Sequence, residues 1–295
     1  MIKASSTVGL CFKDEAPTVE EALYKCFHLS KSQIKKQNFS ANFLKKKVYA
    51  KMECHLPIDL INDKKINPEY TGTPLDIIYE DDSFLVLNKK IKVHSHPLNY
   101  SDTENCLSFL AEKGYDKILK VNFPNYDRGL LYRLDYETSG VLVYMKKESD
   151  LKLLRENFRN QIKEKKYWAI VQGDFDKEGD YRHFFKPSGP KGQKMQVFEE
   201  EKEGSFEGFL SIIKKSFNAK KNISLVEVEL ITGLRHQIRA QLAFLGYPIL
   251  GDELYAGVSH HPRLFLHAHH YAVMLEQKEY VFNAPVDESF SITLD

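Results

Sequence analysis

The chain has 295 residues, of which 42% are hydrophobic and 28% charged, and its formal net charge is +1. This length predicts one large and one smaller domain, and the composition excludes a fibrous or a disordered protein. No stretch approaches the ~18 consecutive apolar residues of a membrane helix, and residues 1–15 lack the apolar core of a secretory signal. We therefore expect a cytoplasmic protein with no membrane contact.

The four cysteines are far apart and form no closely spaced pair: Cys11, Cys26, Cys54 and Cys106. A zinc site needs clustered ligands, and a disulfide framework is typical of short, cysteine-rich secreted chains. The sequence therefore predicts reduced thiols and no metal.

The N-terminal region is basic. Residues 25–51 contain eight lysines and no acidic residue, and residues 1–67 carry +5, which leaves −4 for the remainder. A helix is predicted over 18–27 with Thr18 as its N-cap, and a second over 31–37 behind Ser30, followed by short strands at 43–50 and 54–60. This pattern fits a small RNA-binding module, although the lysines also fit a solvated surface.

A polar linker is predicted over residues 62–74, which include Pro68, Gly72 and Pro74. Hydrophobic periodicity then predicts these elements: strands at 77–80, 84–88, 140–145, 167–172 and 223–230, and helices at 150–161 and 235–245. Many strands with fewer, irregularly interspersed helices favour an α+β fold over a βαβ repeat. We expect domains at residues 1–67 and 68–295.

Arg133 and Asp135 precede the strand at 140–145, and they share a face if this segment is extended. A loop that leads into a core strand is a common place for catalytic groups. A turn in which Asp135 binds the backbone explains the same residues without any chemistry.

A second group spans 232–239. If the helix begins at Arg235, then Arg235 and Arg239 lie four residues apart on one helix face, where they could bind phosphate or keep a carboxylate ionised. Tyr167 begins an apolar strand and fits either the core or a surface that stacks on a base. His94 and His96 lie two residues apart and could be metal ligands, but no nearby acidic residue or cysteine completes a ligand set.

Together these segments resemble the RluA-like family of RNA pseudouridine synthases over about residues 74–285. Five motifs match in order: 86–97, 132–140, 166–173, 232–239 and 246–255. The resemblance implies a catalytic domain with a mixed, largely antiparallel central sheet and flanking helices. The N-terminal region resembles the alpha-L type RNA-binding module at residues 29–34, so a small domain of that type is implied there.

The resemblance also implies the roles of single residues. Asp135 matches the aspartate that family members need for activity, Tyr167 the aromatic that packs against the base, and Arg239 the cation that pairs with the aspartate. Arg133 matches the arginine that enters the RNA stack and helps to extrude the uridine. A substrate-binding set is thereby expected: Arg133, Leu134, Arg235, His236 and Gln237.

Three positions depart from the family pattern beside these residues. Tyr132 replaces a histidine, Leu234 replaces an arginine, and the segment after Lys89 lacks the usual proline and glycine. These departures bear on the substrate and the entry cleft more than on the reaction.

The sequence thus predicts a monomeric isomerase that needs no cofactor and no metal and converts uridine to pseudouridine in a structured RNA. Large-subunit ribosomal RNA is the first expectation and transfer RNA the alternative. Two other hypotheses remain open: a catalytically silent RNA-binding or ribosome-assembly factor, and a metal hydrolase that uses histidines among positions 94, 96, 260, 261, 267, 269 and 270.

Overall fold

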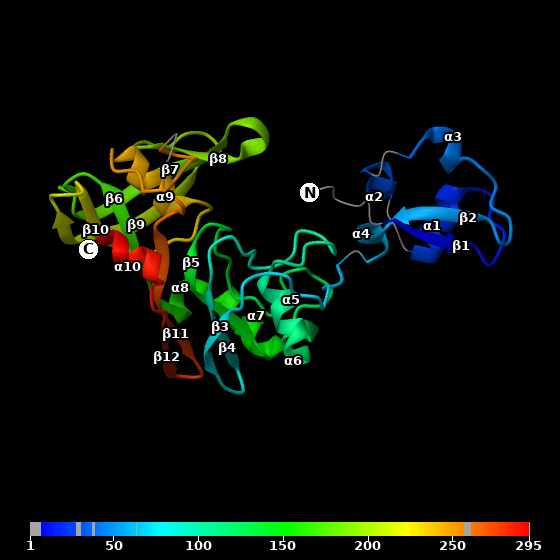
Figure 1. Ribbon diagram of the computed structural model, residues 1–295, viewed down its shortest axis with the longest axis horizontal. Coiled ribbons are helices and arrows are strands. Elements are labelled where there is room, and N and C mark those ends of the chain that lie inside the picture. Colours follow the sequence, from blue (N-terminus) through cyan, green and yellow to red (C-terminus); the bar gives the residue numbers. More distant parts are fainter. Residues whose placement is uncertain (1–6, 28–30, 37–38, 63, 257–260, 295) are drawn as a thin grey trace. The chain divides into compact units, whose positions relative to one another are not determined.

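The computed structural model describes residues 7–27, 31–36, 39–62, 64–256 and 261–294. The chain divides into two compact units (Figure 1): residues 1–67 with 98–103, and residues 68–97 with 104–295. The division after residue 67 lies in the polar segment predicted as a linker, whereas the return of residues 98–103 to the first unit was not expected. Among the described residues, no helix is long and apolar enough to cross a bilayer.

In its described residues, the first unit has a small two-stranded sheet and four short helices. Its elements are β1 (Thr7–Cys11), α1 (Val19–Phe27), α2 (Lys31–Lys36), α3 (Ala41–Leu44), β2 (Glu53–Pro57) and α4 (Ile58–Ile61). Strands β1 and β2 pair antiparallel. The core contains Val19, Leu23, Ile34, Val48 and Leu56 among others, and a core this small gives limited stability on its own.

Local hydrogen bonds decide where the sequence prediction holds in this unit. Thr18 caps α1 as expected, because its hydroxyl accepts a bond from the Glu21 amide at 3.1 Å. The strand predicted at 43–50 is wrong: Ser40 accepts from the Phe43 amide at 3.2 Å and starts helix α3 instead. The strand predicted at 54–60 ends at Pro57, where α4 begins. The predicted cap Ser30 lies outside the described residues.

The second unit contains a ten-stranded sheet in the order β3-β4-β5-β11-β6-β10-β9-β7-β8, with β12 paired to β11. Its strands are β3 (Asp76–Glu80), β4 (Phe84–Lys89), β5 (Ser139–Met145), β6 (Ile162–Gln172), β7 (Gly179–Ser188), β8 (Lys194–Phe198), β9 (Phe206–Asn218), β10 (Ile223–Leu230), β11 (Leu266–Leu275) and β12 (Lys278–Asn283). All pairs in it are antiparallel except β5 with β11. The expected α+β class with a mixed, largely antiparallel sheet is therefore confirmed.

The helices of this unit are short, and Figure 1 shows α5 and α6 beside the β3–β4 end of the sheet. They are α5 (Cys106–Glu112), α6 (Asp116–Lys120), α7 (Glu148–Glu156), α8 (Phe158–Gln161), α9 (Gln237–Phe244) and α10 (Glu288–Leu294), with a 3₁₀ turn at Pro190–Gly192. The helix predicted over 150–161 is broken at Asn157, and residue 162 already belongs to β6. Strands β4 and β5 are buried along their whole length, which explains their nearly continuous apolar sequence.

The parallel contact between β5 and β11 requires a glycine. Gly140 pairs with Ala268, and its φ is +115°. A Cβ atom at position 140 would lie 2.2 Å from the Ala268 carbonyl oxygen. Only a residue without a side chain lets these two backbones approach this closely. Asp135 lies in the loop that leads into this junction, so the junction fixes one end of that loop.

Candidate active site

Buried hydrogen bonds hold the loop that carries Asp135. Ser95 accepts from the Leu134 amide at 3.1 Å and donates its hydroxyl to the Leu134 carbonyl at 2.9 Å. The Thr138 amide donates to the Asp135 carbonyl at 3.1 Å and closes a turn. The backbone around Asp135 is therefore fixed from two sides, while its side chain remains about one quarter exposed, at 28%.

Lys89 lies under the same loop and is fully buried. Its ammonium group donates to the backbone carbonyls of Val93 at 2.8 Å and Tyr136 at 3.2 Å, and also to that of Lys90. Burial lowers the pKa of Lys89 to about 8, although the charge of Asp135 opposes this shift. This cation ties the strand β4 to the residue that follows Asp135.

Arg239 reaches Asp135 from helix α9. Its Nη1 lies 3.5 Å from Asp135 Oδ2, within ion-pair distance, as the family resemblance implied. Its Nε and Nη2 atoms each donate to one oxygen of Asp252 at 2.8 Å, a bidentate pair in which the Asp252 side chain is completely buried. Burial works against the charge of Arg239, but the hydrogen bond and charge of Asp252 outweigh it and raise its pKa.

Asp252 is held in turn by the backbone that follows it. Its Oδ1 accepts from the amides of Leu254 at 3.0 Å and Tyr255 at 3.1 Å. The Tyr255 ring lies 5.5 Å from the Arg239 guanidinium carbon. Asp252 and Tyr255 are functional candidates that sequence reasoning missed. Residues 251–255 belong to the last of the five motifs, but the sequence of a short polar loop does not indicate which side chains it contacts.

The predicted helix start at Arg235 is wrong, and this changes the arginine pair. Helix α9 begins at Gln237, and His236 has a left-handed backbone with φ 54°. Arg235 thus precedes the helix; its guanidinium is exposed and donates to the Gly192 carbonyl. The two guanidinium groups do not share a helix face: Arg239 is directed inward to carboxylates and Arg235 outward to the loop between β7 and β8.

Tyr167 lies within β6, not at the start of a strand as predicted, and only 7% of it is exposed. Burial, and next the negative charge of Asp135, raises the pKa of its hydroxyl well above the usual value. The side chain is therefore held as a neutral phenol at pH 7.

The expected substrate-binding residues fall into two groups. Arg133 and Arg235 are exposed and His236 is partly so. Leu134 and Gln237 are buried. Gln237 accepts from the Thr232 hydroxyl at 2.8 Å and donates to the Phe209 carbonyl at 3.1 Å, so its amide is used to fix the start of α9.

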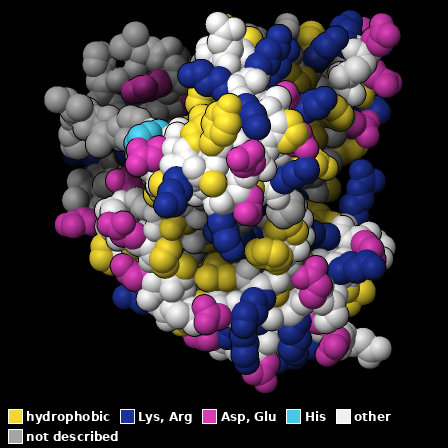
Figure 2. All heavy atoms as spheres, turned by 90° about the vertical axis from the view of Figure 1, so that its right-hand side faces the viewer, with side chains coloured by type: hydrophobic (Ala, Val, Ile, Leu, Met, Phe, Trp, Pro, Cys, Tyr) yellow, Lys and Arg dark blue, Asp and Glu magenta, His cyan; other side chains and the backbone are white. Residues whose placement is uncertain are grey.

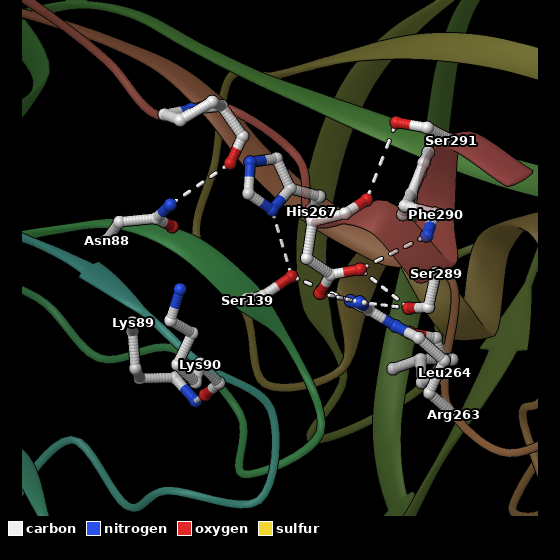
Figure 3. Close-up of polar contacts among 12 residues, drawn as sticks. Asn88, Lys89, Lys90, Ser139, Arg263, Leu264, His267, Ser289, Phe290 and Ser291 are labelled. Atoms are coloured by element: carbon white, nitrogen blue, oxygen red, sulfur yellow. Dashed lines mark hydrogen bonds and ion pairs between the residues drawn. The ribbon is translucent and has the colours of Figure 1, made fainter. Parts of the chain in front are cut away.

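Ser139 is the first residue of β5, directly after the loop that carries Asp135. Figure 3 shows its hydroxyl between Arg263 and His267. Arg263 donates to Ser139 Oγ at 2.8 Å, and Ser139 Oγ lies 2.9 Å from His267 Nδ1. His267 Nε2 lies 3.0 Å from the Ala284 carbonyl, so Nε2 carries the proton and Nδ1 accepts from Ser139. Burial lowers the pKa of His267 to about 4.

Two of the histidines counted as possible metal ligands have other contacts in the structure. Both ring nitrogens of His267 have partners, and the His269 ring stacks on Trp168 at 4.2 Å. Among the described residues, no group of three or more histidine, cysteine or acidic side chains is placed to hold a metal ion. His260 lies outside the described residues.

Comparison with known proteins decides the family. Residues 83–244, more than half of the chain, match the family model described as RNA pseudouridylate synthase. The chain belongs to the RNA pseudouridine synthase family. The matched range includes Asp135, Tyr167 and Arg239. The RluA-like resemblance of the sequence is thereby confirmed, and the protein is an RNA-modifying isomerase whose substrate is RNA.

Relatives in this family act on different RNAs. The ribosomal large subunit pseudouridine synthase D of Borreliella burgdorferi is 30% identical over 83% of this chain and 79% of its own. The large subunit synthase C of Buchnera aphidicola is 34% identical over 74% and 69%. The tRNA pseudouridine synthase C of Vibrio vulnificus is 30% identical over 72% and 91%.

A solved structure shares the fold of this pseudouridine synthase. Human RNA pseudouridylate synthase domain containing 1 superposes with a TM-score of 0.58 at 21% identity, over 72% of this chain and 84% of that one. At this identity the likeness supports the arrangement of strands and helices and leaves the substrate open.

Proposed function

We propose that this chain isomerises uridine to pseudouridine in large-subunit ribosomal RNA, with Asp135 as the catalytic residue. The single observation that carries the assignment is the pairing of a partly exposed carboxylate with a buried arginine at 3.5 Å. An arginine at that distance can hold the carboxylate in place, and a carboxylate is a group that acts as a nucleophile or a base.

The reaction explains what the other groups have to do. The bond between N1 of the base and C1′ of the sugar breaks, the base turns, and a bond forms between C5 and C1′. The proton on C5 leaves and N1 gains one, so no redox partner is consumed and no group is lost. The neutral Tyr167 side chain, which feels the charge of Asp135, is suited to pack against the detached uracil. The exposed Arg133 side chain is suited to fill the gap that the extruded uridine leaves in the RNA.

Large-subunit ribosomal RNA is the proposed substrate because the relatives D and C named above carry that substrate in their names. The relative that names transfer RNA makes transfer RNA the second candidate. We place the reaction in the cytoplasm, where both RNAs are available, and expect the protein to act as a monomer without a cofactor.

The first unit is proposed to be a small RNA-binding domain of the alpha-L type, formed by residues 1–67. Its exposed lysines, such as Lys45 and Lys46, support this role. Figure 2 shows a face on which Lys and Arg side chains lie among acidic and hydrophobic ones. Contacts of lysines with phosphates are expected to be sensitive to salt.

The test is tritium release from RNA transcribed with 5-tritiated uridine. Wild-type protein should release tritium from large-subunit ribosomal RNA, and Asp135→Asn should reduce the rate by at least ~10³-fold because the amide cannot act as a nucleophile or base. Asp82→Asn, in the exposed turn between β3 and β4, is the control for the charge change. A wild type that binds RNA but releases no tritium from ribosomal or transfer RNA would instead be a silent binding factor.

A further inference from the structure

His236 occupies a costly position for its residue type. It is the N-cap of α9, yet its side chain makes no capping hydrogen bond, and its backbone is left-handed with φ 54°. Serine, threonine, aspartate and asparagine are preferred at N-caps, and a left-handed conformation costs a residue with a Cβ about 1 kcal/mol or more. Strain of this kind persists where the surrounding structure holds a side chain for a purpose.

The ring of His236 lies between Tyr255 and Asp135. Its Nδ1 is 3.3 Å from the Tyr255 hydroxyl, and its Nε2 is 3.8 Å from Asp135 Oδ2. The Tyr255 oxygen also accepts from the Met195 amide at 2.8 Å, which fixes it in place. The Tyr255 hydroxyl can then donate to Nδ1, and this leaves the ring proton on Nε2, facing the carboxylate.

His236 and Arg239 approach the same oxygen of Asp135. Arg239 Nη1 is 3.5 Å and His236 Nε2 is 3.8 Å from Oδ2. Within the described part of the chain, no hydrogen bond or ion pair is recorded for Oδ1. The carboxylate therefore has one oxygen turned toward two nitrogen donors and the other left for a substrate.

We propose that His236 is a positioning residue for Asp135: with its tautomer set by Tyr255, it holds Oδ2 on the side of Arg239 and presents Oδ1 to the uridine. This rests on the proposed role of Asp135 and differs from the RNA contact expected for His236 from the sequence. The pair His236–Tyr255 thus works on the orientation of the carboxylate and not on the affinity for RNA.

The surroundings of His236 favour the neutral ring. Burial lowers its pKa, and the positive charges of Arg239 and Arg235 act in the same direction, whereas Asp135 and Asp252 oppose them. A neutral ring at pH 7 can accept from Tyr255 and still donate from Nε2. Protonation at low pH makes Nδ1 a donor to the Tyr255 oxygen and places a second positive charge beside Asp135. This charge weakens the carboxylate as a nucleophile or base, so the rate should fall as the ring is protonated.

The test measures single-turnover rates and RNA dissociation constants separately, with 5-tritiated large-subunit ribosomal RNA and transfer RNA transcripts as probes. His236→Ala should slow the reaction at least ~10-fold while the dissociation constant changes less than ~2-fold. His236→Gln should recover much of the rate, because its amide nitrogen can donate to Asp135 and its oxygen can accept from Tyr255. Tyr255→Phe should slow the reaction less than His236→Ala.

The pH profile provides a readout that a purely structural role would not change. The acid limb of the wild type should contain a step that is absent in His236→Gln and shifted in Tyr255→Phe. The matched control is His183→Gln, at a buried histidine that contacts Gln241 at 3.0 Å and stacks on Tyr181. This control should keep the wild-type rate and profile.

Each other outcome overturns the inference. If His236→Ala weakens RNA binding at an unchanged rate, His236 is an RNA contact. If His236→Ala and His236→Gln are equally slow and equally unstable to heat, the residue is structural. If neither changes the rate, Oδ2 needs no second donor. A wild type without activity, by contrast, contradicts the proposed function itself, and the two failures are therefore distinct.

Discussion

Arg239 has two carboxylate partners with different roles. Asp252 takes two short hydrogen bonds from it, whereas Asp135 is approached by the remaining nitrogen at 3.5 Å. The bidentate pair fixes the orientation of the guanidinium group. Asp135 therefore faces a positive charge whose position is set by Asp252. Asp252 therefore orients the side chain of Arg239 toward Asp135.

Asp252→Asn should be strongly destabilising because it leaves the buried charge of Arg239 without its main partner. We expect a loss of about 3 kcal/mol or more in the free energy of unfolding, measured by urea denaturation. Asp174→Asn is the control: its ion pair with Lys214 is largely exposed, so less than about 1 kcal/mol should be lost. Equal losses in the two variants would contradict the role given to Asp252.

Lys89 predicts a pH dependence of stability. Its folded-state pKa of about 8 lies below its ordinary value of 10.5. Between these values the unfolded chain binds more protons than the folded one, so the contribution of this group to stability rises as the pH rises from about 8 to about 10.5. Below pH 8 the cost of burying the charge is fully present.

Lys89→Met should remove this slope. The difference in unfolding free energy between wild type and variant should shift by about 2 kcal/mol in favour of the wild type from pH 8 to pH 10, by urea denaturation at each pH. Lys152→Met, at an exposed helix position, should show no such shift. Parallel stability curves for wild type and Lys89→Met would show that folding does not shift the pKa of this lysine.

At the scale of elements, the junction of β5 with β11 makes the sharpest prediction. Gly140→Ala forces a Cβ atom to 2.2 Å from the Ala268 carbonyl in a φ region that alanine avoids, so we expect a loss of about 3 kcal/mol or more. Gly114→Ala has a similar positive φ of +79° but no atom within 4 Å of the added Cβ, and should cost only about 1–2 kcal/mol. Thermal unfolding of both variants measures the difference.

Elements with strong local signals were predictable from the sequence. The hairpin of β3 and β4 and the strands β5 and β10 were found because their apolar runs are bounded by turn residues or alternate with polar ones. The start of α9 was missed because Gln237 fixes it by bonds to Thr232 and Phe209. No local pattern contains the second of these contacts.

The residues of the candidate site were likewise predictable only where a sequence motif contains them. Asp135, Tyr167 and Arg239 came from family motifs, and the structure brings Arg239 within ion-pair distance of Asp135. Asp252 and Lys89 were not recognised as supports because their partners are distant in sequence or are backbone carbonyls. Such partners appear only once the sheet has formed.

At the scale of the whole molecule, the lysines of the first unit should set the salt dependence of RNA binding. Replacing Lys45, Lys46 and Lys51 by glutamine should lower the slope of log K against log salt by up to about 3 and weaken binding, with the rate at saturating RNA unchanged. The control replaces three exposed lysines of the second unit, Lys152, Lys202 and Lys278. The RNA dissociation constants are measured by filter binding over a range of salt concentrations. An equal change of slope in both triple variants would contradict a dedicated binding domain.

Among the described residues, strand β11 is the next-to-last strand in chain order, yet it lies between β5 and β6 in the sheet. A nascent chain that has not yet emerged past residue 275 has two sheet halves with unpaired edges at β5 and β6, which is a state prone to aggregation. A protein truncated by premature termination before β11 would be in the same state permanently. The sheet of the second unit can therefore close only after β11 has been synthesised.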